Sequence, residues 1–331
     1  MTSNSFKREL NLGEQLSQGE GGRRPQVGVI GLGRMGEAFA MNLIASGFRV
    51  TVFDRNPEKR LRLEDLGACA VDDLSGFAGV DAVLTSLPND EAVASTVLGT
   101  GGLADILGAN SMHISMSTIS PGMCRRLAER HSRAQQAFVS APVLGNPDMA
   151  RSQQLFIIAS GPDSDVRRAA AIMRCLGQRI FYIGERADAA SIMKLGANVL
   201  TAMTLQGMGE VLALLRKADI APDVAFDVLT NSLFDARVHK TYGGKILAER
   251  YAPPGMTALL AAKDLRLALA EADDFGVPMP ATRLVHDRIG ALIERGWAQL
   301  DWSALGLLAA SDAGLPSLRY APQSEGEEAA P

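Results

Sequence analysis

The sequence predicts a two-domain protein: a Rossmann-type, doubly wound parallel α/β sheet followed by an all-α domain. Between residues 26 and 185, short β-branched runs alternate with helix-like segments rich in Ala, Leu and Arg. This alternation is typical of βαβ units and of a mostly parallel sheet with both faces covered. After Asp188 the strand-like runs stop, and residues 189–310 have the pattern of helices. We therefore predict a domain boundary at residue 188.

The expected elements follow in chain order. We expect strands at residues 27–30, 49–53, 82–85, 111–114, 137–139, 156–159 and 180–183, each a short apolar run. We expect a first helix at residues 37–46 and, after the boundary, helices at 189–218, 222–232, 257–275 and 280–295. The two domains are thus expected at residues 26–188 and 189–318. Residues 1–25 and 319–331 are predicted to be disordered tails, because they are polar or acidic and poor in large apolar residues.

Composition excludes several classes of protein. The 331 residues include 33 Lys and Arg against 37 Asp and Glu, and this slightly acidic balance argues against a nucleic-acid binder. The four histidines are scattered without an H-x-x-x-H pair, so we predict no metal site. The three cysteines form no C-x-x-C pair and predict neither a zinc site nor a disulfide framework; they are Cys69, Cys124 and Cys175.

The sequence also predicts a cytoplasmic protein without a membrane segment. The first 25 residues are polar and lack the apolar core of a signal peptide and the acid-poor composition of a transit peptide. The longest uncharged apolar stretch, residues 195–209, is too short to span a bilayer and contains Asn198 and Gln206. The cysteine usage fits a reducing compartment.

The strongest motif is a Gly-x-Gly-x-x-Gly turn between a predicted strand and a predicted helix, Gly31-Leu32-Gly33-Arg34-Met35-Gly36. Gly31 permits the tight turn, Gly33 lets the backbone approach a pyrophosphate, and Gly36 lets the helix pack close to the strand. The anion would then bind N–H groups at the helix N-terminus. Asp54 follows the second predicted strand, where an acid can bind a ribose 2′-hydroxyl. The motif predicts a dinucleotide site; the alternative is a tight turn in another kind of α/β protein.

The residues around Asp54 bear on the choice of cofactor. Asp54 favours a free 2′-hydroxyl, whereas Arg55, together with Arg34, could pair with a 2′-phosphate. We expect NADP(H) to be favoured slightly over NAD(H). Arg55 could equally be a solvated loop residue.

An isolated lysine is the second signal. Lys194 lies in an apolar predicted helix that carries no further charge until Glu210. Burial disfavours the ammonium form of a lysine and lowers its pKa, which makes it a usable general acid or base. Asn198, four residues on, is expected on the same helical face. From this helix alone, a lysine that reaches solvent beside the helix start is the better interpretation. The pair Lys263-Asp264 on another helix carries no signal by itself.

Six segments in order resemble the β-hydroxyacid dehydrogenase family, which includes 3-hydroxyisobutyrate dehydrogenase, tartronate semialdehyde reductase and the glyoxylate/succinic semialdehyde reductases. 6-Phosphogluconate dehydrogenase is a larger relative. The resemblance covers about residues 26–310. The segments are the glycine turn, Leu87-Pro88, Ser117-Thr118-Ile119-Ser120-Pro121, Ala141-Pro142-Val143-x-Gly145, Lys194-Leu195-x-x-Asn198 and Lys263-Asp264-Leu265.

The resemblance implies a role for each matching residue. Lys194 matches the catalytic lysine, which protonates the carbonyl oxygen in reduction and takes the hydroxyl proton in oxidation. Asn198 matches the residue that holds the substrate, and Asp264 would lie at the edge of its pocket. The implied cofactor contacts beyond the glycine turn are Leu87 and Pro88 on the nicotinamide side, Thr118, and Lys263 near the nicotinamide ribose.

The family further implies an active site in the cleft between the domains, and a homodimer or homotetramer formed through the α-helical domain. We include Ser117, Gly145 and Asn146 among the expected substrate-binding residues. The family usually has Asp-Ala-Pro-Val-Ser-Gly-Gly here, whose last N–H groups bind a carboxylate. In this chain Leu144 replaces the serine, Asn146 replaces a glycine and Pro147 has no N–H to donate, so we expect an altered carboxylate cradle.

The leading hypothesis is an NAD(P)-dependent oxidoreductase that moves hydride between the nicotinamide and a small β-hydroxy acid or its semialdehyde, with Lys194 as the acid–base. A second hypothesis is an imine reductase on the same fold, but imine reductases generally carry Asp or Tyr in place of this lysine. A third is a non-catalytic dinucleotide-binding module, which would need neither Lys194 nor Asn198.

Overall fold

The computed structural model describes residues 25–317 and 319–320. The predicted tails at 1–25 and 319–331 therefore lie outside the described residues, apart from Pro25, Arg319 and Tyr320. The chain divides into two compact units, the first ending at Lys194 and the second beginning at Leu195. This division falls six residues after the boundary predicted at residue 188, which stays a prediction. Each unit is described by itself.

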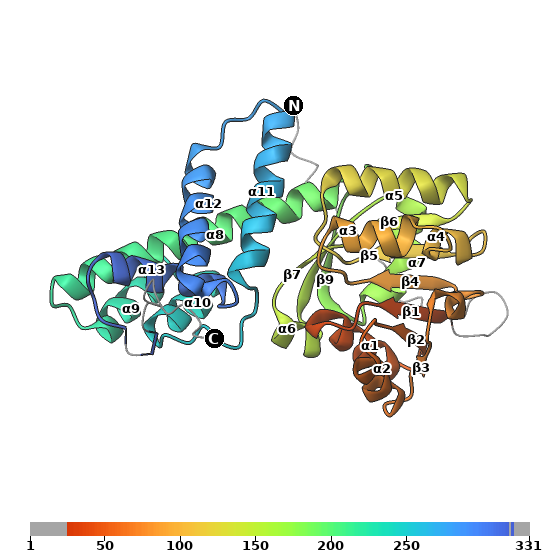
Figure 1. Cartoon of the computed structure of the whole chain (residues 1–331), viewed down its shortest axis with the longest axis horizontal. Helices are drawn as coiled ribbons and strands as arrows, with labels where there is room; N and C mark the ends of the chain where they lie inside the picture. The colour runs from red at the N-terminus through yellow and green to blue at the C-terminus, as the bar shows by residue number, and fades with distance from the viewer. Residues whose placement is uncertain (1–24, 318, 321–331) are drawn as a thin grey trace, which may run out of the picture. The chain divides into compact units, whose positions relative to one another are not determined.

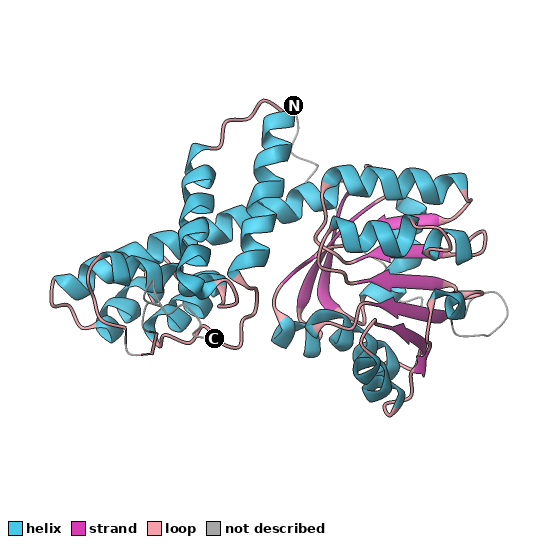
Figure 2. Ribbon diagram, viewed as in Figure 1, coloured by secondary structure: helices cyan, strands magenta, loops and turns pink. Residues whose placement is uncertain are grey.

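The first unit contains a mostly parallel sheet. Its strand order is β3-β2-β1-β4-β5-β6-β8-β7, with β9 beside β8, nine strands in the described part of the chain (Figures 1 and 2). Only the β6–β8 and β7–β8 pairings are antiparallel among these strands. The strands are β1 (Gln26–Ile30), β2 (Arg49–Phe53), β3 (Cys69–Ala70), β4 (Ala82–Thr85), β5 (Met112–Ser115), β6 (Ala137–Ser140), β7 (Val143–Leu144), β8 (Leu155–Ser160) and β9 (Gly177–Gly184).

Helices cover both faces of this sheet. One core cluster joins Val27 and Val29 of β1 to residues of α1 and α7, and another joins Ile30 and Val83 to η1 and α5. Alternate residues of a strand point to opposite faces, which explains why neighbours in β1 enter different cores. The helices are α1 (Arg34–Ala45), α2 (Pro57–Glu64), η1 (Leu74–Phe77), α3 (Asp90–Val93), η2 (Ala94–Leu98), α4 (Leu103–Ile106), α5 (Pro121–Arg133), α6 (Pro147–Arg151) and α7 (Asp163–Met173).

The connection from β3 to β4 creates a switch point in this sheet. β1 pairs with β2 on one side and with β4 on the other. The connection that follows β1 therefore leads to one side of this strand, and the connection that follows β3 leads back to its other side. Ligands of doubly wound sheets bind at such a point, outside the carboxyl ends of the strands. The predicted Rossmann fold is confirmed. The glycine turn follows β1, and Leu87-Pro88 follows β4.

The second unit is helical throughout its described residues, apart from one isolated β-bridge between Thr257 and Asp301. Its core uses residues spaced by three or four positions, such as Leu195, Val199 and Ala202 of α8. The helices are α8 (Ala189–Lys217), which begins in the first unit, α9 (Pro222–Thr230), α10 (Arg237–Leu247), α11 (Ala258–Asp274), α12 (Pro280–Leu292), η3 (Ile293–Trp297), η4 (Trp302–Ala304) and α13 (Leu305–Asp312).

Helix α8 is a core helix of unusual length. By length and composition alone, α8 is long and apolar enough to cross a membrane. Half of its most apolar stretch is buried inside the protein, and α8 also carries the buried polar residues Asn198 and Gln206. Core helices of globular proteins commonly combine these properties, so the apolar character of α8 is explained by packing.

Candidate cofactor site and active site

The glycine turn has a geometry that only glycine allows at two of its positions. Gly31 has φ +90°, and its N–H donates to the Phe53 carbonyl oxygen at 2.9 Å. A Cβ on Gly36 would lie 1.9 Å from the Gly31 carbonyl oxygen. A Cβ on Gly33 would meet nothing within 4 Å. Gly31 and Gly36 are therefore required by the fold, while Gly33 keeps open space in front of the turn.

That open space lies at the N-terminus of α1, a helix of 12 residues. The N-cap residue is Gly33, which makes no side-chain hydrogen bond to the first turn. Backbone N–H groups at a helix N-terminus attract anions, and here no capping side chain competes for them. The turn thus fits the pyrophosphate of a dinucleotide. Of the other turn residues, Leu32 is buried in the core, Met35 packs partly against it, and Arg34 is exposed.

Asp54 fastens the glycine turn to the end of β2. Its Oδ2 accepts from the Leu32 N–H at 2.7 Å, and its Oδ1 accepts from the Asn56 N–H at 2.9 Å. The Lys59 ammonium lies 3.8 Å from Oδ2. Arg55, the next residue, is exposed. The sequence predicted that Asp54 binds a ribose, but it gave no sign of Lys59, because no motif marks the start of α2.

Two side chains join the loops that follow β4 and β5. The Ser117 hydroxyl accepts from the Leu87 N–H at 2.8 Å and lies 3.3 Å from the Thr85 carbonyl oxygen. Asp90 accepts from the Ser120 N–H at 2.9 Å and also from the Ser120 hydroxyl. Ser117 is 4% exposed, so its hydroxyl makes these two contacts in the interior of the protein.

The same two loops carry the other cofactor residues that were expected in this unit. Pro88 follows Leu87 and is exposed, while Thr118 follows Ser117 and is partly exposed. Asp90 was not predicted from the sequence, since its partner Ser120 is 30 residues away.

The altered segment after β7 forms the start of a helix. The side-chain oxygen of Asn146 caps α6 by accepting from the Met149 N–H at 2.9 Å, and Pro147 occupies the first turn, where its missing N–H costs nothing. Gly145 has φ +143°, and a Cβ there would lie 2.5 Å from a methyl carbon of Leu155. The segment is therefore built as a helix cap, and the expected alteration of the carboxylate cradle stays a prediction.

Lys194 and Asn198 are both buried, at 9% and 5% exposure, one turn apart on α8. Residues four apart on a helix share a face. The structure thus favours a buried Lys194 over the solvated lysine that this helix alone suggested. Lys194 is the last residue of the first unit, and Asn198 belongs to the second.

Within the second unit, three predicted residues form one cluster. The Asn198 amide nitrogen donates to Oδ2 of Asp264 at 2.5 Å. The Lys263 ammonium lies 3.0 Å from Oδ1 of the same carboxylate. Asp264 is only 2% exposed, so a buried carboxylate orients the side chains of Asn198 and Lys263. Lys263-Asp264, uninformative in the sequence, is thus part of a polar site.

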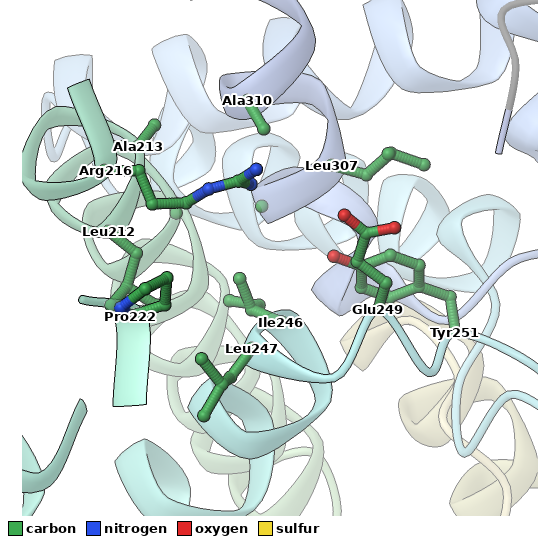
Figure 3. A pocket seen from close by; sticks show the side chains of 12 residues that line it. Leu212, Ala213, Arg216, Pro222, Ile246, Leu247, Glu249, Tyr251, Leu307 and Ala310 are labelled. Carbon is green, nitrogen blue, oxygen red and sulfur yellow. The ribbon is translucent and has the colours of Figure 1, made fainter. Parts of the chain in front are cut away.

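A separate cavity of about 130 Å³ lies in the second unit (Figure 3). The side chains of Arg216 and Glu249 reach over it from opposite sides. Arg216 donates to the Pro316 carbonyl oxygen at 3.4 Å, and Glu249 accepts from the Ser317 hydroxyl at 2.8 Å. The chain itself supplies these partners, and none of the predicted site residues lines the cavity. In the described residues, no group of three or more His, Cys, Asp or Glu side chains is arranged to hold a metal ion.

Comparison with known proteins finds matches to both units of the chain. Residues 26–184 match the NAD binding domain of 6-phosphogluconate dehydrogenase. Residues 188–308 match the family described as the NAD-binding domain of NADP-dependent 3-hydroxyisobutyrate dehydrogenase. The uncharacterized oxidoreductase YfjR of Bacillus subtilis is 34% identical over 281 residues, which cover 85% of this chain and 98% of the relative. The 3-hydroxyisobutyrate dehydrogenase of Pseudomonas aeruginosa is 31% identical and covers 79% of this chain and 90% of its own.

Solved structures show the same fold. The 3-hydroxyisobutyrate dehydrogenase of Salmonella typhimurium has a TM-score of 0.78 at 24% identity, covering 86% of this chain and 99% of its own. An imine reductase from Pseudomonas sp. has a TM-score of 0.56 at 21% identity, covering 86% and 99%.

The fold, the glycine turn and these matches define an NAD(P)-dependent oxidoreductase that acts on CH–OH groups. The chain belongs to the β-hydroxyacid dehydrogenase family. The resemblance drawn from six sequence segments is confirmed, and so is the expectation of an enzyme of this class. The imine reductase alternative fits less well.

Proposed function

We propose that this enzyme reduces a small semialdehyde, or oxidises the corresponding β-hydroxy acid, with Lys194 as the general acid–base. The observation that carries the proposal is a buried lysine one helical turn before Asn198, whose amide is oriented by the buried Asp264. A desolvated lysine is suited to proton transfer near neutral pH.

The nicotinamide cofactor supplies or accepts the hydride when it is bound. The glycine turn and the N-terminus of α1 bind its pyrophosphate. In reduction, the Lys194 ammonium donates its proton to the carbonyl oxygen as hydride reaches the carbonyl carbon; in oxidation, the neutral amine removes the hydroxyl proton. Asn198, whose amide nitrogen donates to Asp264, is proposed to hold the substrate beside Lys194.

The proposed cofactor preference is NADP(H) over NAD(H). Asp54 already accepts from two backbone N–H groups and lies 3.8 Å from Lys59, which reduces its repulsion of a 2′-phosphate. Arg55 and Arg34 are exposed beside the turn and carry the charges that such a phosphate needs. The family description for residues 188–308, which names an NADP-dependent enzyme, supports the same preference.

The substrate class comes from the relatives. They are named 3-hydroxyisobutyrate dehydrogenase and glyoxylate/succinic semialdehyde reductase, and their names point to short hydroxy acids and aldehyde acids. Because Asn146 and Pro147 alter the usual carboxylate cradle, the substrate carboxylate is proposed to bind chiefly to N–H or ammonium groups elsewhere in the site. Ser117, Gly145 and Asn146 remain predicted contributors.

The proposal is tested by following cofactor oxidation with NADPH and NADH in parallel. The substrates are glyoxylate, succinic semialdehyde, methylmalonate semialdehyde, an uncharged aldehyde of similar size and a cyclic imine. We expect turnover of at least one aldehyde acid, and faster turnover with NADPH. Preference for the imine or for the uncharged aldehyde would contradict the proposed substrate class.

The helical domain is proposed to form a homodimer or homotetramer in the cytoplasm. Helices α8 and α9 expose apolar side chains in a regular pattern, with Leu200 and Leu214 two-thirds exposed at a spacing of two heptads, and Val224 and Val228 one turn apart. A soluble monomer seldom leaves so many large apolar groups on one domain in water. Light scattering on the purified protein tests the assembly, and Leu200→Glu should dissociate it.

A further inference from the structure

The first turn of α8, the helix that carries Lys194 one turn further on, is attached to the rest of the first unit by side chains from two other elements. All of the residues involved belong to residues 1–194, the unit that contains the glycine turn. The contacts come from α5 and from the end of β8, and each can be followed atom by atom.

Asp188 makes the strongest of these contacts. It directly precedes α8, and its backbone carbonyl accepts from the Ile192 N–H at 3.1 Å. Its carboxylate is 3% exposed and binds Arg125 of α5 at 2.6 Å and Arg186 at 3.0 Å. Burial would raise the pKa of Asp188, but the hydrogen bonds and charges of Arg186 and Arg125 outweigh it and hold the pKa below its ordinary value. The group stays ionised and paired.

Two serines complete the attachment. The Ser160 hydroxyl, at the end of β8, accepts from the Ala190 N–H and donates to the Ala187 carbonyl oxygen, both at 3.0 Å. The Ser191 hydroxyl lies 3.0 Å from the sulfur of Cys124 on α5. Ser160, Ser191 and Cys124 are all buried, so these contacts are shielded from water.

Lys194 lies three residues after Ser191 and four after Ala190, on the helical face that these residues share. Fixing that face against α5 and β8 fixes where the Lys194 side chain leaves the helix relative to the glycine turn. We propose that Asp188, held by Arg125 and Arg186, is a positioning residue for Lys194. The inference rests on the proposed role of Lys194 as the acid–base.

The test compares Asp188→Asn with Asp188→Glu. Asp188→Asn should lower kcat about ten- to a hundredfold, the range expected when a catalytic group is displaced by a fraction of an ångström to an ångström. The solvent isotope effect on kcat should rise because proton transfer becomes slower, while the cofactor Kd should change less than about twofold. Asp188→Glu, which keeps the charge, should recover part of the kcat.

Asp163→Asn is the matched control, since it removes another acid–arginine pair of 2.6 Å, with Arg167 on α7 of the same unit. It should leave kcat and the isotope effect unchanged. Should Asp188→Asn fail to fold, Arg125→Gln serves instead, because the Arg125 side chain is 53% exposed and its loss leaves Arg186 on Asp188. It should lower kcat less than Asp188→Asn and raise the isotope effect.

The outcomes separate the two proposals. If Lys194→Ala keeps full turnover, the proposed function fails, whatever Asp188 does. If Lys194→Ala abolishes turnover but folded Asp188→Asn and Arg125→Gln keep the wild-type kcat and isotope effect, the positioning role is wrong. A loss of activity that merely follows the loss of folded protein, with an unchanged isotope effect, would also overturn it.

Discussion

The amide nitrogen of Asn198 donates a hydrogen bond to the buried carboxylate of Asp264 across 2.5 Å. The other oxygen of that carboxylate lies 3.0 Å from the ammonium of Lys263. One carboxylate therefore sets the orientation of an amide on α8 and the position of a cation on α11. Because an amide has a donor end and an acceptor end, this bond fixes which way round the Asn198 amide lies.

Replacing Asp264 with Ala should therefore damage catalysis through its neighbours. A hydrogen bond to a charged group contributes about 1.5–3 kcal/mol, which corresponds to a loss of about 10- to 150-fold in kcat/KM. Steady-state kinetics measure it. Asp227→Ala is the control, since it removes an exposed bond of the same type from Asn231, at 2.7 Å. Equal kcat/KM values for the two variants would show that Asp264 has no role in the site.

The glycine turn allows binding to be separated from folding. A Cβ on Gly36 would overlap the Gly31 carbonyl oxygen, whereas a Cβ on Gly33 would meet no protein atom. Gly36→Ala should destabilise the protein by more than about 1–3 kcal/mol, the usual cost of overpacking. Gly33→Ala should cost less than about 1 kcal/mol but weaken cofactor binding at least about tenfold. Thermal unfolding and cofactor titration measure the two effects; strong cofactor binding by Gly33→Ala would contradict the site.

Cofactor preference should depend on the residues after β2. Arg55→Ala should raise the KM for NADPH about tenfold, the loss of one charge-assisted contact to a phosphate, and leave the KM for NADH unchanged. Lys59→Ala should act in the same direction. Arg62→Ala, whose side chain pairs with Glu37 on the same surface, is the control. If NADH suffers as much as NADPH, Arg55 does not contact a 2′-phosphate.

A buried chain of hydrogen bonds makes the first unit sensitive to acid. The Gln136 side-chain nitrogen donates a hydrogen bond to the Leu107 carbonyl oxygen. Its oxygen Oε1 is therefore the end that accepts from His131 Nδ1, at 2.7 Å. His131 Nε2 then accepts from His113 Nδ1, and His113 Nε2 accepts from the Thr85 hydroxyl, both at 2.9 Å. His131 cannot take a second ring proton without losing its hydrogen bond from His113. Burial lowers the pKa of both histidines, that of His131 to about 4.

These lowered pKa values predict a loss of stability in acid. Below pH 6.5 the unfolded chain binds protons that the folded chain excludes, so the stabilisation is fully present above pH 6.5 and decreases toward pH 4. The slope should be about 1.4 kcal/mol per pH unit for each histidine. Urea unfolding at pH 7.5, 6.5 and 5.5 measures it. His131→Gln should flatten the slope, and His286→Gln should not; a wild-type midpoint that stays constant down to pH 5.5 would refute the account.

The sequence predicted the helices and strands that have a recognisable local pattern of residues. All seven expected strands occur, because each contains a short run of apolar residues that the sequence shows, and the four expected helices of the second unit occur within a few residues of their predicted ends. β3 and β7 were missed because two residues are too few to show a pattern. α13 was missed because residues 305–310 are buried on every side, which leaves no amphipathic period to detect.

The candidate site was predictable from the sequence only in part. Glycines at fixed spacing and an isolated lysine are visible in the sequence because the chemistry depends on residue type. The contacts that hold them are not visible, since they join residues far apart: Asp90 with Ser120, Arg125 with Asp188, and Asn198 with Asp264. Such pairs depend on tertiary packing, and a sequence pattern carries no trace of them.

Lys194→Ala, assayed beside Lys217→Ala, tests the central claim most directly. Lys217 is the exposed lysine at the other end of the same helix. We expect Lys194→Ala to abolish turnover of every aldehyde acid while the cofactor Kd stays within about twofold, since a general acid–base supplies about 10²–10⁴ in rate without binding the nucleotide. Lys217→Ala should behave as wild type. Turnover of Lys194→Ala at the wild-type rate would contradict the claim.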